Sequence, residues 1–92
     1  MQQSIRRAHL IVRGRVQGVG YRYATRSQAA SLGVAGWMRN RPDGNVEAVF
    51  EGAAERVELL LRWCRKGPPA AYVDEIEVEW QEPTGEQGFR VW

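Results

Sequence analysis

The order of predicted strands and helices indicates an α+β protein with a ferredoxin-like split β-α-β fold, in which two helices lie on one face of an antiparallel sheet. Two kinds of pattern support this prediction. Several segments alternate apolar and polar residues, as half-buried strands do, and others repeat apolar residues every three or four positions, as helices do. In sequence they give β-α-β-β-α-β and then a short terminal strand. This fold hosts many activities, so it does not by itself identify the chemistry.

The first predicted strand is Ala8–Arg13, with Leu10 and Val12 facing one side of the sheet. A helix is predicted from about Tyr21 to Leu32. Gly33 follows it, and glycine is the residue that most readily takes the left-handed conformation that ends a helix.

A β-hairpin is predicted next. Val34–Asn40 forms its first strand, and the segment 41–45 contains the proline, aspartate and glycine typical of a tight turn. Apolar and polar residues then alternate along Val46–Glu51, which predicts the returning strand.

The second predicted helix has the clearest period in the chain. Val57, Leu60, Leu61 and Cys64 fall on one helical face, and the segment 67–69 (Gly-Pro-Pro) ends the helix.

Two strands complete the predicted sheet. Ile76, Val78 and Trp80 alternate with glutamates, which predicts a half-buried strand, and Phe89–Trp92 predicts a short final strand. Residues 1–92 are therefore expected to form a single domain.

The composition narrows the protein class. No segment approaches the 18 apolar residues of a membrane span, and the N-terminal residues lack the apolar core of a signal peptide. Cys64 is the only cysteine, so an internal disulfide is excluded, and one cysteine with one histidine cannot form a structural zinc site. We expect a cytoplasmic monomer that binds no membrane.

The charge is unevenly distributed along the chain. Residues 1–46 contain eight arginines and one acidic residue (+7), whereas residues 47–92 contain five basic and ten acidic residues (−5), for a net charge of +2. An anionic ligand would be attracted to the basic half. Solvation of one strand face by the glutamates is an equally good explanation of the acidic half.

The segment 14–22 (GRVQGVGYR) is the most informative part of the sequence. A glycine-rich turn between a strand and a helix leaves main-chain N–H groups free at the helix N-terminus, where the peptide dipoles favour an anion. Arg22 would add a planar guanidinium that suits phosphate. Asn40, at the end of the second predicted strand, has a carboxamide that can bind a water molecule.

These segments resemble two signatures of the acylphosphatase family. The first is matched by Val12, Gly14 and the run from Val16 to Arg22, and the second by Gly36–Asn40 followed by Gly44, Val46 and Gly52. The resemblance extends from about Arg7 to Trp92. Tyr21 replaces the phenylalanine usual in the family, and Met38 replaces a small apolar residue; neither change removes an atom that the chemistry needs.

The resemblance implies hydrolysis of acyl phosphates to a carboxylate and inorganic phosphate without a metal or cofactor. Arg22 and Asn40 would be the catalytic residues, with Arg22 binding the phosphoryl group and Asn40 orienting the attacking water. The glycine-rich loop would bind the substrate through the residues Arg15, Val16, Gln17, Gly18, Val19 and Gly20.

Two other classes of function remain open from the sequence. The first is RNA binding, because a sheet of this kind can bind RNA and the sequence pI is about 9.1. The sequence contains no RNA-binding strand motif, however, and for this reason we expect no nucleic-acid partner. The second class is a non-catalytic anion-sensing or scaffold domain. The physiological acyl phosphate and any regulation are not predicted.

Four further residues are not assigned to the chemistry. His9 is expected to be a solvated or packed residue, and Cys64 is expected to be a core residue. Trp37 could line the site or pack on the sheet, and the carboxylate of Trp92 could pair with an arginine near the site.

Overall fold

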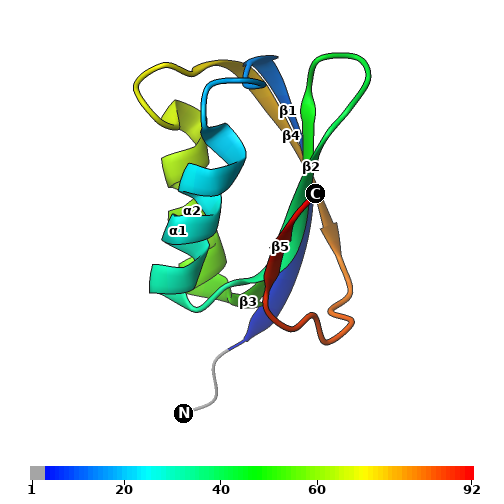
Figure 1. The fold of residues 1–92 in the computed structure, drawn as a ribbon. Coiled ribbons are helices and arrows are strands. Elements are labelled where there is room, and N and C mark those ends of the chain that lie inside the picture. The colour runs from blue at the N-terminus through cyan, green and yellow to red at the C-terminus, as the bar shows by residue number, and fades with distance from the viewer. Residues whose placement is uncertain (1–3) are drawn as a thin grey trace.

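The computed structural model describes residues 4–92, and within them five strands form one sheet with two helices on one face (Figure 1). The order of strands across the sheet is β4-β1-β3-β2-β5. The predicted ferredoxin-like fold is confirmed. The elements are β1 (Ile5–Arg15), α1 (Tyr21–Leu32), β2 (Ala35–Asn40), β3 (Val46–Ala53), α2 (Ala54–Lys66), β4 (Tyr72–Gln81) and β5 (Phe89–Val91).

The predicted antiparallel pairing holds for β1 to β4, whereas β5 pairs with β2 in parallel. The reason is the route of the chain. β4 lies at one edge of the sheet, and its last residue is at the same end of the sheet as the first residue of β2. Residues 82–88 then carry the chain across this end to the other edge (Figure 1). β5 therefore starts beside the start of β2 and runs in the same direction, with Gly36 opposite Phe89. The sheet is mixed.

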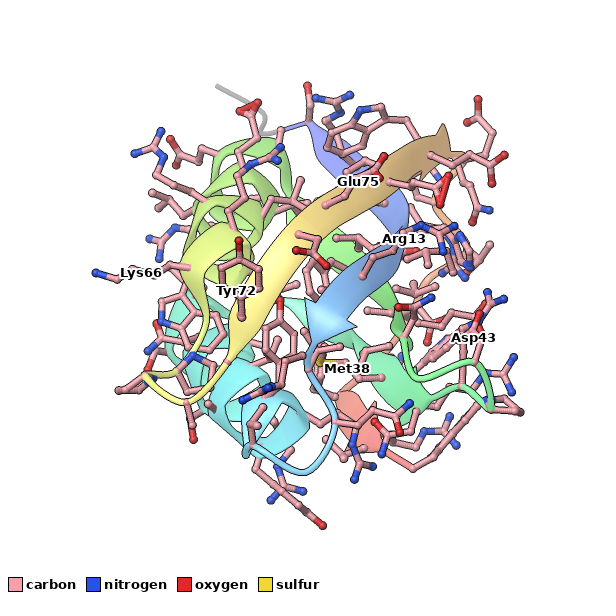
Figure 2. All side chains as sticks on the ribbon, turned by 90° about the horizontal axis from the view of Figure 1, so that it is seen from above. Arg13, Met38, Asp43, Lys66, Tyr72 and Glu75 are labelled. Atoms are coloured by element: carbon pink, nitrogen blue, oxygen red, sulfur yellow. The ribbon has the colours of Figure 1, made fainter. Side chains whose placement is uncertain are left out.

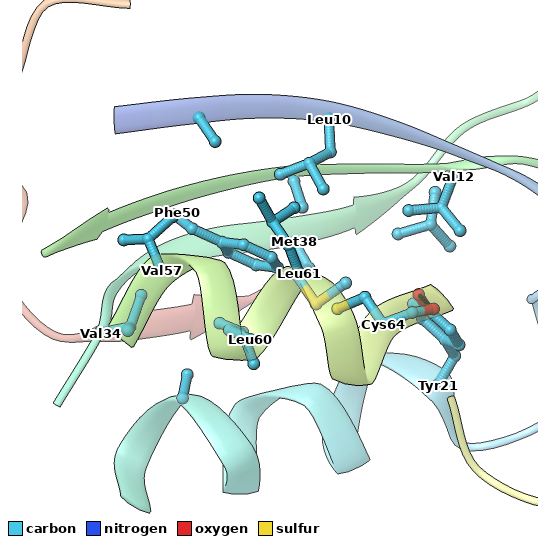
Figure 3. Close-up of a cluster of buried hydrophobic side chains, with 14 of the residues drawn as sticks. Leu10, Val12, Tyr21, Val34, Met38, Phe50, Val57, Leu60, Leu61 and Cys64 are labelled. Carbon is cyan, nitrogen blue, oxygen red and sulfur yellow. Dashed lines mark hydrogen bonds between the residues drawn. The ribbon is translucent and has the colours of Figure 1, made fainter. Parts of the chain in front are cut away.

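The core lies between the sheet and the helices (Figure 3). Leu10 and Val12 of β1 are fully buried, as the alternation predicts, and so are Val57, Leu60 and Cys64 on the predicted inner face of α2. Burial raises the pKa of the Cys64 thiol to about 12. Cys64 is thus a core residue.

The hydroxyl group that distinguishes Tyr21 from phenylalanine is satisfied inside this core. Tyr21 is 1% exposed, and its hydroxyl donates to the main-chain oxygen of Cys64 at 2.7 Å. Because a buried hydroxyl without a partner would cost stability, this bond explains how the core accepts a tyrosine here. Met38, the other departure from the family pattern, is fully buried.

The glycine after α1 ends the helix as predicted. Gly33 has φ 69° and ψ 31°, and its N–H points to the carbonyl oxygens of Ala29 and Ala30. The left-handed conformation turns the chain out of the helix and into β2.

The sheet face opposite the helices, the open face, is partly covered by residues 82–88. Glu51 of β3 points to this face, where the sequence pattern suggests a solvated glutamate, yet it is 5% exposed. Its carboxylate accepts hydrogen bonds from the main-chain N–H groups of Thr84, Gly85 and Glu86 at 2.7–3.0 Å, and from Arg7 Nη1 at 3.1 Å. Burial opposes ionisation of Glu51, but these donors outweigh it and hold its pKa below the usual range.

The substitution Glu51→Gln should therefore destabilise the fold by about 2–4 kcal/mol at pH 7, because four donors lose a charged acceptor. Since the folded-state pKa is lowered, this stabilisation is present above about pH 4.3 and is lost as the pH falls through the folded-state value. Urea denaturation at pH 7 and pH 3 measures the difference from the wild type, which should shrink in acid. Glu82→Gln, an exposed neighbour, is the control. A difference that persists unchanged at pH 3 would contradict this account.

Candidate active site

The glycine-rich loop lies between β1 and α1, at the end of the sheet that is uppermost in Figure 1. Val16 is buried and Val19 packs against the core, so both ends of the loop are anchored by apolar side chains. Gly18 and Gly20, which are exposed, have φ of 73° and 80°. These left-handed values strain any residue with a Cβ, so the loop backbone depends on glycine at both positions.

The loop presents main-chain N–H groups that the fold does not use. Within residues 4–92, no N–H from position 17 to position 20 donates to a main-chain oxygen. α1 begins directly after the loop, and its first turn contains no acidic residue. The partial positive charge of the helix N-terminus is thus not neutralised by its own side chains.

Arg22 is half-buried in the first turn of α1 and is tied to the C-terminal end of the chain. Its Nη1 donates to the main-chain oxygen of Trp92, the last residue of the sequence. The N–H of Trp92 in turn donates to the oxygen of Met38 at 2.9 Å, and its indole stacks on Trp37 with ring centroids 5.1 Å apart. Arg22 is therefore connected to β2 two residues before Asn40.

Asn40 is the last residue of β2, and its side chain is exposed. The hairpin turn that follows is held against the loop by Gln17, whose Nε2 donates to the carbonyl oxygens of Arg41 and Asn45 at 2.7 and 2.9 Å. Figure 2 views the molecule from this end and labels Met38 of β2 and Asp43 of the turn.

These contacts bring three predicted parts of the site to one end of the molecule. The loop reaches the residue after Asn40 through Gln17, and Arg22 reaches β2 through Trp92. Arg15 differs from the other loop residues. It is the last residue of β1, is exposed, and lies opposite Tyr72 of β4.

The one acidic side chain of the hairpin turn is paired. Asp43 accepts from the N–H of Asn45 at 3.0 Å and lies 3.0 Å from Arg41 Nη2. The N–H of Asn45, together with Arg41, lowers the pKa of this carboxyl. The turn therefore places no unpaired negative charge beside the loop.

His9 lies away from this region. Its Nε2 is 2.7 Å from Glu47 Oε2 on the open face, and Arg39 donates to the other oxygen of the same carboxylate at 2.6 Å. The imidazole of His9 is thus hydrogen-bonded to Glu47 within the sheet, as expected of a packed residue. In the described part of the chain, no group of three or more potential metal ligands comes together. Neither helix within residues 4–92 is long and apolar enough to cross a membrane.

Comparison with known proteins identifies the family. The family model for acylphosphatase matches residues 8–91. The chain belongs to the acylphosphatase family. It is therefore related to hydrolases, and the resemblance seen in the two sequence signatures is confirmed.

Individual relatives match along nearly their whole length. The chain is 60% identical over 86 residues to an acylphosphatase of Pelotomaculum thermopropionicum, covering 92% of this chain and 94% of the relative. It is 57% identical over 90 residues to an acylphosphatase of Trichormus variabilis, covering 98% and 89%. A solved acylphosphatase structure from Coxiella burnetii superposes with a TM-score of 0.92 at 33% identity, covering 100% and 99% of the two chains.

Two features of the site go beyond the sequence prediction. The side chain of Gln17 connects the loop to the hairpin turn, whereas the sequence suggested only a main-chain role for this residue. The arginine that contacts Trp92 is Arg22. No local pattern identifies either contact, because the partners are at least 24 residues apart in sequence.

Proposed function

We propose that this protein hydrolyses acyl phosphates to a carboxylate and inorganic phosphate without a metal ion. Membership of the acylphosphatase family supports the reaction class. The observation that carries the assignment to this site is the convergence of three parts: a loop with free N–H groups, Arg22 and the β2 end that bears Asn40.

In this proposal the loop and Arg22 bind the phosphoryl group. The main-chain N–H groups from Val16 to Gly20 donate to its oxygens, and the guanidinium of Arg22 adds a fixed positive charge. Phosphoryl transfer through a loose transition state needs mainly positioning and charge stabilisation, and these groups supply both.

Asn40 orients the attacking water in line with the bond that breaks. The water oxygen forms a bond to phosphorus, and the phosphorus–oxygen bond to the acyl group breaks, so that the carboxylate leaves with the electron pair. A carboxylate is a stable leaving group, which removes the need for a strong general acid. The amide of Asn40 does not titrate, so the proton of the water passes to a phosphate oxygen.

Hydrolysis of benzoyl phosphate by the purified protein tests the proposal. Turnover should persist in EDTA, and inorganic phosphate should inhibit competitively because it binds where the phosphoryl group binds. Lack of turnover, or turnover that EDTA abolishes and added metal restores, would overturn the proposed reaction or its metal independence. Micromolar binding of short RNA that weakens with salt, without turnover, would favour the RNA-binding class instead.

The variants Arg22→Ala and Asn40→Ala should separate binding from turnover. Without Arg22, kcat/KM should fall by about 10³-fold or more and phosphate inhibition should be lost, because both need the guanidinium. Without Asn40, kcat should fall by about 10²-fold or more while the inhibition constant for phosphate changes little. Steady-state kinetics with phosphate as inhibitor measures both effects.

The control for these variants is Arg26→Ala, which removes an exposed arginine one turn further along α1. This variant should leave kcat, kcat/KM and the inhibition constant for phosphate unchanged. Equal loss of turnover and phosphate binding in Asn40→Ala would disprove the water-orienting role.

The loop conformation gives a separate test. Gly18→Ala should force a left-handed residue that costs about 1–2 kcal/mol, and the loop should relieve this strain by moving its N–H groups. Phosphate inhibition should weaken by about tenfold. Gly33→Ala is the matched control, because Gly33 has a similar φ and open surroundings at the other end of α1. It should lower stability without changing inhibition; an equal effect of both variants on inhibition would rule out the loop as the phosphate site.

A further inference from the structure

Gln17 makes the direct side-chain contact between the glycine-rich loop and the turn after β2. One atom, Nε2, donates to two carbonyl oxygens, those of Arg41 at 2.7 Å and Asn45 at 2.9 Å. The amide nitrogen of glutamine has two hydrogens, so these two bonds use its full donor capacity. Gln17 is half-buried, which limits competition from water for these bonds.

The two carbonyls mark the two ends of the turn, and the turn is already closed without Gln17. The N–H of Arg41 donates to Asn45 at 2.8 Å, the N–H of Gly44 donates to Arg41 at 3.1 Å, and Asp43 accepts from the N–H of Asn45 at 3.0 Å. Each carbonyl thus keeps one partner if Gln17 is removed. Gln17 is therefore not needed to form the turn; it fixes where the turn lies relative to the loop.

The loop end of the Gln17 contact is also held in place. Gln17 lies between the buried Val16 and the exposed Gly18, and Val19 packs against the core two residues later. A planar amide that joins an anchored loop to both ends of a closed turn restricts the turn's orientation as well as its distance, since its two N–H groups point at two different acceptors. Asn40 directly precedes this turn.

We propose that Gln17 is a positioning residue, which acts through the hairpin turn to hold Asn40 at the correct distance from the phosphoryl group bound by the loop. This inference rests on the proposed function. The phosphoryl site belongs to the loop and Arg22, and the water site belongs to Asn40, so the Gln17 side chain sets the geometry between the two. Errors of about 1 Å in such geometry cost about 10²-fold in rate.

The test is Gln17→Met, which keeps the length of the side chain and removes both donors, together with Gln17→Leu as a second variant without donors. With benzoyl phosphate, kcat should fall by about 10- to 100-fold, while the inhibition constant for inorganic phosphate should stay within about threefold of the wild type. Urea denaturation confirms that each variant is folded at the assay temperature. Gln81→Met is the matched control, since Gln81 also has two side-chain hydrogen bonds but lies on β4.

A merely structural role would not produce this separation of kcat from phosphate binding. The double variant Gln17→Met with Asn40→Ala adds a second readout. If Gln17 acts through Asn40, removing Gln17 should not lower the residual kcat of Asn40→Ala further.

The outcomes distinguish the two proposals. If the wild type does not hydrolyse benzoyl phosphate, the proposed function fails. If the wild type is active and kcat of Gln17→Met is within threefold of it, the positioning role fails while the function stands. The positioning role also fails if Gln17→Met weakens phosphate inhibition as much as it lowers kcat. It fails as well if Gln17→Met lowers kcat by the same factor in the wild type and in the Asn40→Ala variant.

Discussion

The register of β2 between β3 and β5 determines where the candidate site residues lie. Gly36 permits this register: its φ is 145°, and a Cβ there would come within 1.8 Å of the carbonyl oxygen of Val49 on β3. On the other side its N–H donates to Gly88 at 2.8 Å, just before β5. A slip of one residue would turn Met38 out of the core and move Asn40 to the open face. The position of Asn40 thus depends on close backbone contact four residues away.

Local patterns in the sequence were sufficient to predict most of the fold. The alternation around Leu10 and Val12 and the helical repeat from Val57 to Cys64 are direct consequences of burying one face of a strand or helix, and the structure confirms both faces. Gly33 predicted the end of α1 for an equally local reason. The loop and Asn40 could be proposed as site residues because a glycine-rich turn and a polar residue at a strand end are themselves local features.

The remaining features depend on contacts that a local pattern does not encode. A three-residue strand such as β5 carries no signal of its direction, which follows from the path of residues 82–88. Glu51 looks like a solvated strand residue until those residues fold over it. The side-chain role of Gln17 likewise requires that the turn at Arg41 be placed beside the loop, and only the completed sheet does so.

The groups in the proposed chemistry do not change charge near neutral pH, because main-chain amides, arginine and asparagine do not titrate there. A fall in pH therefore affects the protein groups of the candidate site through carboxylates that stabilise the structure. Glu51 holds the main chain from Thr84 to Glu86, this segment leads into β5, and the residue after β5 contacts Arg22. Protonation of Glu51 would loosen the segment that ends at the partner of Arg22. The structural bonds that stabilise the edge of the sheet and the geometry of the proposed phosphoryl site are in this way parts of one connected arrangement.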